Sequence, residues 1–509
     1  MFKKMLCLGL VVFLLFSMCS CGKTIDISGG EAAEDDLSFI SVMLGDKFLE
    51  EWDEEIVALN VSWNDIRVSP EDEEKYPKLK EMFTKLNDRA LSDSKALMYE
   101  LQSSVKDLGG GTEENPLHLE GETEIIVQRA DSKIISLLED KFVYMGGVHP
   151  DYFYATFNFN PKTGEEILLT DVLSNTEALP ELLDKLVTEK YDYVEFGEGF
   201  PEGIFSQYAP EDYKWTLDYQ GITFWFSPYD IAAYAVGPLS AKIYFDDNSD
   251  LFKKEFLTSA PESYGINLPP RQRIDFDLNP NDGVKDYVEV DISPDPYYGN
   301  YNMLSVTVNG KTVADEIKYA YDFDVSVVRV GDKSYLYSES WSDSAYYMFD
   351  TWDLNGDEPK IVDELYDTQI YYEFVEKEQL PYKSIISNPK AFKLIKSFEL
   401  LGSRGGWASF KANEMSGIPE MTDEAYTFDW GHDLTLKMPI EAEVLPNMEK
   451  EEISAGITIS PYQTDGKSYI DAKDEAGKIF RIKLDTSVRP TKVNGISEEE
   501  CFDNILYAG

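Results

Sequence analysis

The sequence predicts an α+β amino-terminal half, in which helices pack on an antiparallel sheet, followed by a mostly-β carboxy-terminal half. Three patterns lead to this prediction. Residues 71–108 repeat their apolar side chains with the 3.6-residue period of a helix and lie between two strand-like segments. Residues 152–159 alternate as a half-buried strand does. From residue 270 onward, short strand-like runs are separated by acidic and glycine-containing turns.

The first residues are typical of a bacterial secretion signal. A basic start precedes an apolar run, residues 5–18, that is too short to span a membrane comfortably. A small residue then precedes Cys21 and a glycine follows it, which resembles a lipobox. We expect residues 1–20 to be a lipoprotein signal peptide and Cys21 to carry a diacylglycerol anchor in the lipid bilayer. Cys19 is the rival site, and a plain secretory signal or an uncleaved anchor is the alternative.

This amino terminus predicts a lipid-anchored protein on the outer face of the cytoplasmic membrane. Residues 21–45 are polar and acidic and would form a flexible tether. Behind the signal, Cys501 is the one remaining cysteine, so no intramolecular disulfide and no cysteine-based zinc site can form there. The formal net charge of −49 argues against nucleic-acid partners and favours cationic proteins or divalent metals, unless it serves solubility alone.

The body of the chain divides into four segments. A strand is predicted at residues 56–63 before the long helical region, and a short amphipathic helix at residues 180–189. A proline-rich linker follows at residues 259–273. We therefore expect a small α+β module at residues 46–118, a core α+β domain at 119–258, a propeller-like or sandwich β domain at 270–385, and a small β barrel or sandwich at 386–509.

The strand at residues 152–159 is the centre of the core domain. Its alternation places one set of side chains, Phe153, Ala155, Phe157 and Phe159, on an apolar face that we expect to be buried. Tyr152 and Tyr154 belong to the opposite, mixed face and are expected to be exposed. The turn at residues 160–164 contains a proline that fixes φ and a glycine suited to a left-handed conformation, which predicts a hairpin.

Two sequence blocks carry a resemblance to a known family. The first is GGVHPDYFYATFNFNPKTGEEILLTDVL, and the second, residues 221–245, is GITFWFSPYDIAAYAVGPLSAKIYF. Together they resemble the extracellular domain shared by RsiV-type anti-sigma factors and PdaC-type peptidoglycan deacetylases, over about a quarter of the chain. With the lack of disulfides, this resemblance implies the surface of a Gram-positive bacterium.

The resemblance implies a binding role. The family domain in RsiV binds a host muramidase, and in PdaC it accompanies an enzymatic domain directed to the cell wall. By resemblance, this chain would bind a lysozyme-like cationic protein or a cell-wall glycan such as peptidoglycan. The sequence shows no RsiV-like sigma-binding segment or transmembrane helix and nothing like the metal ligands of the PdaC deacetylase domain, so neither of those functions is implied.

Three residues are candidates for ligand binding. His149 precedes a proline and has no cysteine, serine or second histidine near it in sequence, which favours a structural role over a catalytic one. Tyr152 and Tyr154, with the acidic loop at residues 195–211, form a hypothetical contact surface, because aromatic anchors in acidic surroundings suit a cationic protein.

A candidate calcium site follows the linker. Asp277, Asn279, Asn281 and Asp286 place oxygen ligands at intervals in an acidic loop with a glycine, which is similar to calcium loops between strands. One extra residue interrupts the spacing, so a simple acidic β-turn is the equal alternative. A second, less complete copy begins at Asp353.

The sequence supports a non-enzymatic binding or sensing protein over two alternatives. It contains no P-loop, Gly-x-Ser-x-Gly, His-Glu-x-x-His or dinucleotide fingerprint. A calcium-stabilised surface scaffold is one alternative. A cell-wall hydrolase using two carboxylates is the other, and among 95 acidic residues the sequence cannot single out such a pair.

Overall fold

Strands dominate the computed structural model, with 50% strand and 16% helix. The structure describes residues 37–53, 56–192, 194, 203–257, 260–294, 302–314, 320–342, 346–375 and 380–507, which leaves the predicted signal peptide and Cys21 outside the described residues. Five sheets are found in this described part. None of its helices is long and apolar enough to cross a membrane.

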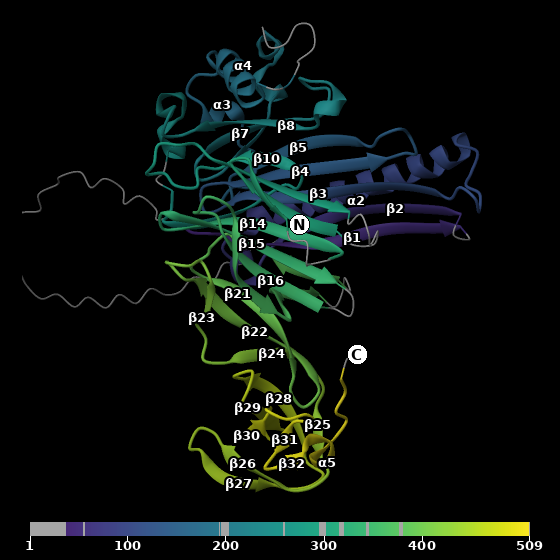
Figure 1. The fold of residues 1–509 in the computed structure, drawn as a ribbon, viewed down its shortest axis with the longest axis vertical. Coiled ribbons are helices and arrows are strands. Elements are labelled where there is room, and N and C mark those ends of the chain that lie inside the picture. Colours follow the sequence, from purple (N-terminus) through teal and green to yellow (C-terminus); the bar gives the residue numbers. More distant parts are fainter. Residues whose placement is uncertain are drawn as a thin grey trace, which may run out of the picture. The chain divides into compact units, whose positions relative to one another are not determined.

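The first sheet has seven strands in the order β19-β20-β1-β2-β3-β4-β5, of which β1 to β5 are labelled in Figure 1. All of its pairings are antiparallel except β2 with β3, which is parallel because a helical crossover connects these two strands. The bounds are β1 Val42–Asp53, β2 Val57–Val68, β3 Leu117–Ala130, β4 Ile135–Tyr144, β5 Asp151–Phe159, β19 Tyr372–Val375 and β20 Leu380–Ser384.

The crossover contains α1 (Pro70–Glu73) and the long helix α2 (Pro77–Asp107), which lies along the sheet in Figure 1. This confirms the predicted helical region, with a break between the two helices. The side chain of Asn87 ties α2 to β2, because it bonds both the N–H and the carbonyl of Ile66, at 2.9 and 3.0 Å. Gly121 leaves room for Leu97, since a Cβ there would lie 2.3 Å from Leu97 Cδ2. The helix therefore packs closely on one face of the sheet and leaves the other face for a different partner.

The strand β5 buries residues of both faces, because Phe159 of the predicted buried face is 4% exposed and Phe157 packs on the core between α2 and the first sheet. Tyr154 is 4% exposed and packs at 5.8 Å on Trp225, whereas Phe153 is 51% exposed. The prediction is therefore wrong at Phe153 and Tyr154, because β5 is the edge strand of its sheet and the residues that bury Tyr154 come from a later part of the chain. The predicted turn forms, with Gly164 at φ 71°, but its second arm is only a bridge from Phe159 to Glu166.

A second layer combines short helices with a three-stranded sheet, β6-β7-β8. The helix α4 confirms the predicted short helix, and it buries Leu179, Leu183 and Val187 in the core of this layer. The bounds are α3 Leu169–Val172, α4 Leu179–Lys190, β6 Lys214–Leu217, β7 Gly221–Phe226 and β8 Leu239–Tyr244, with 3₁₀ helices η1 Phe205–Gln207, η2 Pro210–Asp212, η3 Tyr234–Val236, η4 Ser249–Leu251 and η5 Lys254–Phe256.

Two sheets form the middle of the chain, β10-β11-β12-β13 and β17-β16-β15-β14-β9. Their core is continuous with the free face of the first sheet, because Ile126 and Leu138 cluster with Val290, Val306 and Val325. The bounds are β9 Ser263–Asn267, β10 Gln272–Asp275, β11 Tyr287–Pro294, β12 Asn302–Val308, β13 Lys311–Ala314, β14 Asp322–Val330, β15 Lys333–Ser342, β16 Tyr346–Asp353 and β17 Lys360–Tyr366.

The last sheet has fourteen strands and follows the path β18-β21-β22-β24-β28-β29-β30-β26-β27, with short strands beside it. The path does not close in the described residues, so the predicted barrel is wrong and an open sheet takes its place. The bounds are β18 Thr368–Ile370, β21 Phe392–Glu399, β22 Ser403–Ala412, β23 Pro419–Met421, β24 Tyr426–Trp430, β25 Leu434–Leu436, β26 Ile440–Val444, β27 Glu449–Ile453, β28 Thr458–Thr464, β29 Tyr469–Asp474, β30 Ile479–Asp485, β31 Lys492–Val493, β32 Ile496–Ser497, α5 Glu498–Cys501 and β33 Phe502–Asp503.

The sheets cross the segment boundaries that the sequence suggested. Strand β3 spans the expected boundary at residue 118, and β1 to β5 form one sheet on both sides of it. Strand β20 returns to pair with β1, with Met43 opposite Ser384. The small module, the core domain and the middle β region are therefore joined by shared sheets and a shared core.

Candidate functional site: an acidic cleft

A cleft of about 660 Å³ lies between the free face of the first sheet and strands β14 and β15. One wall comes from β1 to β5, and the other includes the start of β14 and Glu339 of β15. The loop between β9 and β10 contributes Arg271, whose φ of 62° is in the left-handed region that non-glycine residues seldom adopt.

Carboxylates from five strands line this cleft. On the first sheet the pairing register places Asp46 opposite Asn64, and Glu124 opposite Asp140, which in turn lies opposite Tyr154. Side chains that are paired across antiparallel strands lie on one face, so these groups form a polar row. The lining carboxylates are Asp46, Glu122, Glu124, Asp140, Asp322, Asp324 and Glu339.

Two cationic side chains, Arg271 and Lys383, line the same cleft. Lys383 is already paired, because its Nζ contacts Asp324 and lies 2.7 Å from Glu339 Oε1. Among the residues that the structure describes, Glu124 and Asp140 have no ion pair, and Asp140 Oδ1 is a buried acceptor without a hydrogen-bond donor. The cleft thus contains more negative charge than its own cations neutralise.

The surroundings raise the pKa values of these carboxyl groups. Burial, followed by the charge of Glu122, raises the pKa of Asp140 to about 7. Burial, followed by the charge of Asp324, raises the pKa of Asp322 to about 7. Burial and the neighbouring carboxylates also hold the pKa of Glu124 well above its ordinary value. Like charges in a partly desolvated space resist ionisation, and such perturbed groups gather at functional sites.

Aromatic side chains complete the lining of the cleft. Trp341 is 42% exposed, and Phe142 meets Tyr152 edge-to-face with ring centroids 5.4 Å apart. Trp63 also contributes to the wall. Aromatic faces attract cations, so this combination of rings and carboxylates favours a positively charged ligand.

The structure brings two of the three predicted ligand-binding residues to the cleft. Tyr152 and Tyr154 both line it, although Tyr154 is buried and not the exposed anchor that the sequence suggested. His149 lies outside the lining: its ring stacks on Tyr234 at 3.8 Å, and its Nδ1 lies 2.9 Å from the carbonyl of Pro150. Residues 195–202 of the predicted acidic loop at 195–211 lie outside the described residues, and residues 203–211, which include η1, are not among those that line the cleft.

Several oxygens of the candidate calcium loop accept hydrogen bonds within the protein, whereas Asp277 Oδ1 has no donor in the described residues. Asp277 Oδ2 accepts from Lys285 Nζ at 2.8 Å, and the two carboxylate oxygens of Asp286 accept from Asn309 and from the N–H of Leu278. The side chain of Asn279 accepts from the N–H of Asn281. No group of three potential metal-ligating side chains occurs in the described parts of the chain, and calcium binding stays a prediction.

Sequence reasoning missed the cleft carboxylates themselves. The signal that could have pointed to them is the placement of Glu122 and Glu124 at alternate positions of one strand, on the same face as the buried Ile126. Charged residues on the core-facing side of a strand need a functional or structural reason.

Comparison with known proteins gives one family match. The family model described as "Protein of unknown function (DUF3298)" matches residues 173–246, which include α4 and the sheet β6-β7-β8. No curated protein matches the chain.

Two solved structures of DUF3298 family proteins are similar. One, from Bacteroides fragilis, is 18% identical with a TM-score of 0.34 and covers 43% of this chain and 95% of its own. The other, from Pseudomonas aeruginosa, is 14% identical with a TM-score of 0.29 and covers 43% of this chain and 96% of its own. Residues 173–246 of this protein are a DUF3298 domain.

Proposed function

We propose that this protein is a non-enzymatic, surface-anchored lipoprotein that binds a cationic protein through its acidic cleft. The observation that carries the proposal is the excess of carboxylates over cations in an open, aromatic-lined cleft. A lysine or arginine side chain of the partner would supply the positive counter-charge that Glu124 and Asp140 do not have within the described residues. Complementary charge across an interface also accelerates association and selects partners.

Two sequence features support the location and the class of partner. The lipobox-like segment ending at Cys21 supports a diacylglycerol anchor on the outer face of the cytoplasmic membrane of a Gram-positive bacterium. The resemblance to the extracellular domain of RsiV-type and PdaC-type proteins supports a lysozyme-like protein as the partner. The same resemblance would also accommodate a cell-wall glycan.

The test is calorimetric titration of residues 22–509 with hen lysozyme at two salt concentrations. We expect a sub-micromolar Kd that weakens only modestly with salt, because interactions in a partly enclosed cleft are screened less than those on an open surface. In a variant with Glu124→Gln, Asp140→Asn and Asp322→Asn, we expect the Kd to rise at least about tenfold, since charged hydrogen bonds contribute about 1.5–3 kcal/mol each.

A matched control separates the cleft from the general charge of the protein. Glu449→Gln, Glu452→Gln and Glu475→Gln neutralise the same number of carboxylates at exposed positions of the last sheet region and should leave the Kd nearly unchanged. Binding that disappears at high salt, or that weakens equally in both variants, would show non-specific charge attraction. Absence of binding to lysozyme, with binding to purified peptidoglycan, would favour the glycan.

One observation favours a second function, cell-wall hydrolysis. A carboxyl group with a pKa of about 7, such as that of Asp140, stays protonated near neutral pH and can act as a general acid beside a second, ionised carboxylate. If this function is correct, residues 22–509 release reducing ends from purified peptidoglycan at pH 6, and Asp140→Asn lowers the rate at least about a hundredfold. Lack of release by the unmodified protein excludes this second function.

A further inference from the structure

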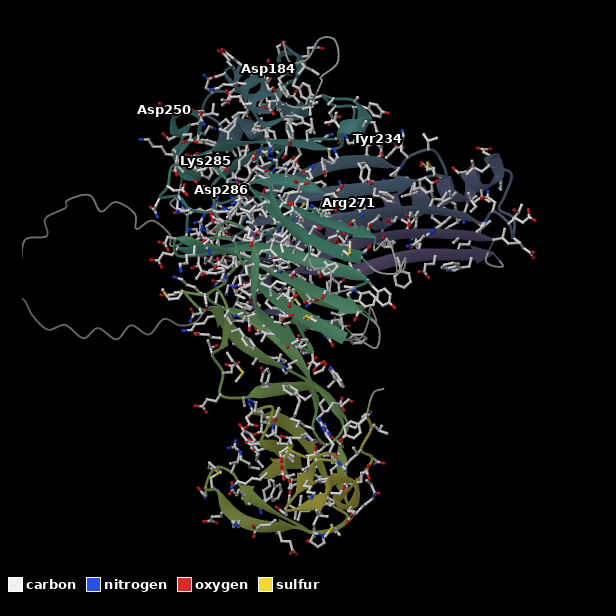
Figure 2. The ribbon with its side chains drawn as sticks, viewed as in Figure 1. Asp184, Tyr234, Asp250, Arg271, Lys285 and Asp286 are labelled. Carbon is white, nitrogen blue, oxygen red and sulfur yellow. The ribbon has the colours of Figure 1, made fainter. Side chains whose placement is uncertain are left out.

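The first sheet carries an exposed surface beyond the acidic cleft. The residues of β1 that line the cleft end at Asp46, and those of β2 begin at Ser62, whereas the two strands continue to Asp53 and Val57. In Figure 2 these strands run on past the labelled Arg271, which lines the cleft. This part of the sheet is therefore a surface that the cleft does not include.

The helix α2 covers one side of this part of the sheet. Leu49 of β1 and Val61 of β2 pack with Leu97 of the helix. Because side chains alternate along a strand, the residues next to Leu49 and Val61 point away from α2. We call the side away from the helix the outer face, and the residues that matter here are Phe48, Glu50, Trp52, Asn60, Glu120 and Glu122.

Two aromatic side chains are exposed on the outer face. Phe48 is 55% exposed and Trp52 is 66% exposed. Phe48 lies opposite Ser62 and Trp52 lies opposite Ala58, so neither ring has a large cross-strand neighbour to cover it. Large apolar side chains that are exposed within a polar surface mark interaction sites, and tryptophan is enriched among the residues that dominate binding.

The outer face is negatively charged. Glu50 lies between the two exposed rings, and Glu120 and Glu122 follow on β3. The described parts of β1 to β4 contribute no lysine or arginine to this face, and His118, 3.5 Å from Glu120, is their one basic group there. A second copy of this chain or an anionic membrane would be repelled by these charges, whereas a cationic protein would be attracted.

The outer face is continuous with the cleft, because Ser62 and Glu122 belong to both surfaces. A specific protein interface buries about 800 Å² on each partner, which corresponds to a patch roughly 30 Å across. Along β1, the distance from Asp46 in the cleft to Trp52 is about 20 Å. A protein that places a cationic side chain in the cleft therefore also covers part of the outer face.

We propose that the outer face is the second contact area of the cationic protein that binds at the cleft, with Phe48 and Trp52 as its apolar anchors. This inference rests on the proposed function, since it requires a cationic protein at the cleft. Both rings are accessible to a partner without any rearrangement of the sheet. The partner surface that fits has an apolar patch bordered by lysine or arginine, because Glu50 lies between the two rings.

The test is calorimetric titration with hen lysozyme of residues 22–509 that carry Phe48→Ala and Trp52→Ala together. We expect the Kd to rise at least about tenfold and its salt dependence to stay the same, because the variant removes two anchors and no charge. Trp52→Lys alone should also raise the Kd at least about tenfold, since it adds a repelling charge. The matched control is Tyr99→Ala on α2, which removes a ring that is 72% exposed and should leave the Kd unchanged.

Hydrogen–deuterium exchange locates the contact independently of the variants. In the described residues β20 pairs with β1 only at Met43 and Leu44, so the rest of β1 has a neighbouring strand on one side alone. Amides at such an open edge exchange rapidly. We expect exchange within residues 46–53 to slow in the lysozyme complex, and exchange around Tyr99 to stay unchanged.

The outcomes separate this inference from the proposed function. A Kd that stays unchanged in the outer-face variants but rises in the cleft variant would overturn the outer face and leave the proposed function in place. Absence of lysozyme binding by the unmodified protein would overturn both. A dimer of the unliganded protein, detected by sedimentation velocity and dissociated by Trp52→Lys, would make a second copy of the chain the occupant and would overturn this inference.

Discussion

Replacing Lys242 with methionine is expected to lower the free energy of unfolding by about 3–5 kcal/mol. The side chains of Lys242 and Asp218 are 1% and 4% exposed, and Lys242 Nζ lies 2.5 Å from Asp218 Oδ2. Lys242 also donates to the carbonyl of Asp275 at 3.1 Å. The variant would leave the Asp218 carboxylate buried without its counter-charge, which is far more costly than losing an exposed pair.

Urea unfolding of residues 22–509, followed by tryptophan fluorescence, measures this loss. The matched control is Lys450→Met, whose pair with Glu441 at 2.6 Å has side chains 65% and 58% exposed and should contribute less than about 1 kcal/mol. Adding Asp218→Asn to Lys242→Met should recover part of the lost stability. Asparagine is neutral, and its side-chain oxygen can still accept from the N–H groups of Gln220 and Gly221. Equal losses in Lys242→Met and Lys450→Met would contradict the prediction.

The elements that the sequence predicted correctly are those with a strong local period. The helix α2 has apolar residues such as Leu79 and Phe83 at helical spacing, and both are buried against the first sheet. The shorter helix α4 also has buried apolar residues at helical spacing, Leu179, Leu183 and Val187. Local spacing fixes which face of such a helix is apolar, and the neighbouring sheet only has to cover that face.

Phe153 and Tyr154 of β5, which reverse the predicted exposure, show where a local pattern is insufficient. Tyr154 is buried because Trp225 packs on it and because its N–H donates to Ser227 Oγ at 3.0 Å, and both partners come from the DUF3298 domain some seventy residues later. The hydrophobicity of Phe153 predicted the reverse. A strand with large side chains on both faces leaves the choice to tertiary packing.

The cleft could not be assembled from the sequence for a related reason. Its carboxylates come from β1, β3 and β4 at one end of the chain and from β14 and β15 near residues 322–339. They meet because the free face of the first sheet packs on the middle sheets and β20 brings Lys383 back beside β1. Pairings at such separation leave no periodic signal, and 95 acidic residues offer too many alternative combinations.

The stability of the unliganded protein is expected to fall between about pH 4 and pH 7 because of Asp140. Its pKa is about 7 in the folded protein, whereas an unfolded aspartate has a pKa of about 3.9. Between these values the folded state holds a proton that the unfolded state releases, so stability is fully present below the unfolded pKa and is lost as the pH rises through 7. The full shift corresponds to about 4 kcal/mol, and access of water to the cleft should reduce it to about 1–2 kcal/mol.

Asp140→Asn should therefore raise the free energy of unfolding at pH 8 by about 1–2 kcal/mol and change it little at pH 4. Urea unfolding at the two pH values measures the difference, and Glu449→Gln, at an exposed position, should show none.

A cationic ligand in the cleft favours the ionised carboxylates and therefore lowers the pKa values that burial raises. Its binding should strengthen from pH 5 to pH 8 and release protons, which calorimetry in buffers of different ionisation enthalpy detects. Stability that does not depend on pH in this range, together with binding that releases no protons, would mean that the cleft carboxylates are ionised throughout. The cleft carboxylates would then carry their full negative charge before a cation binds.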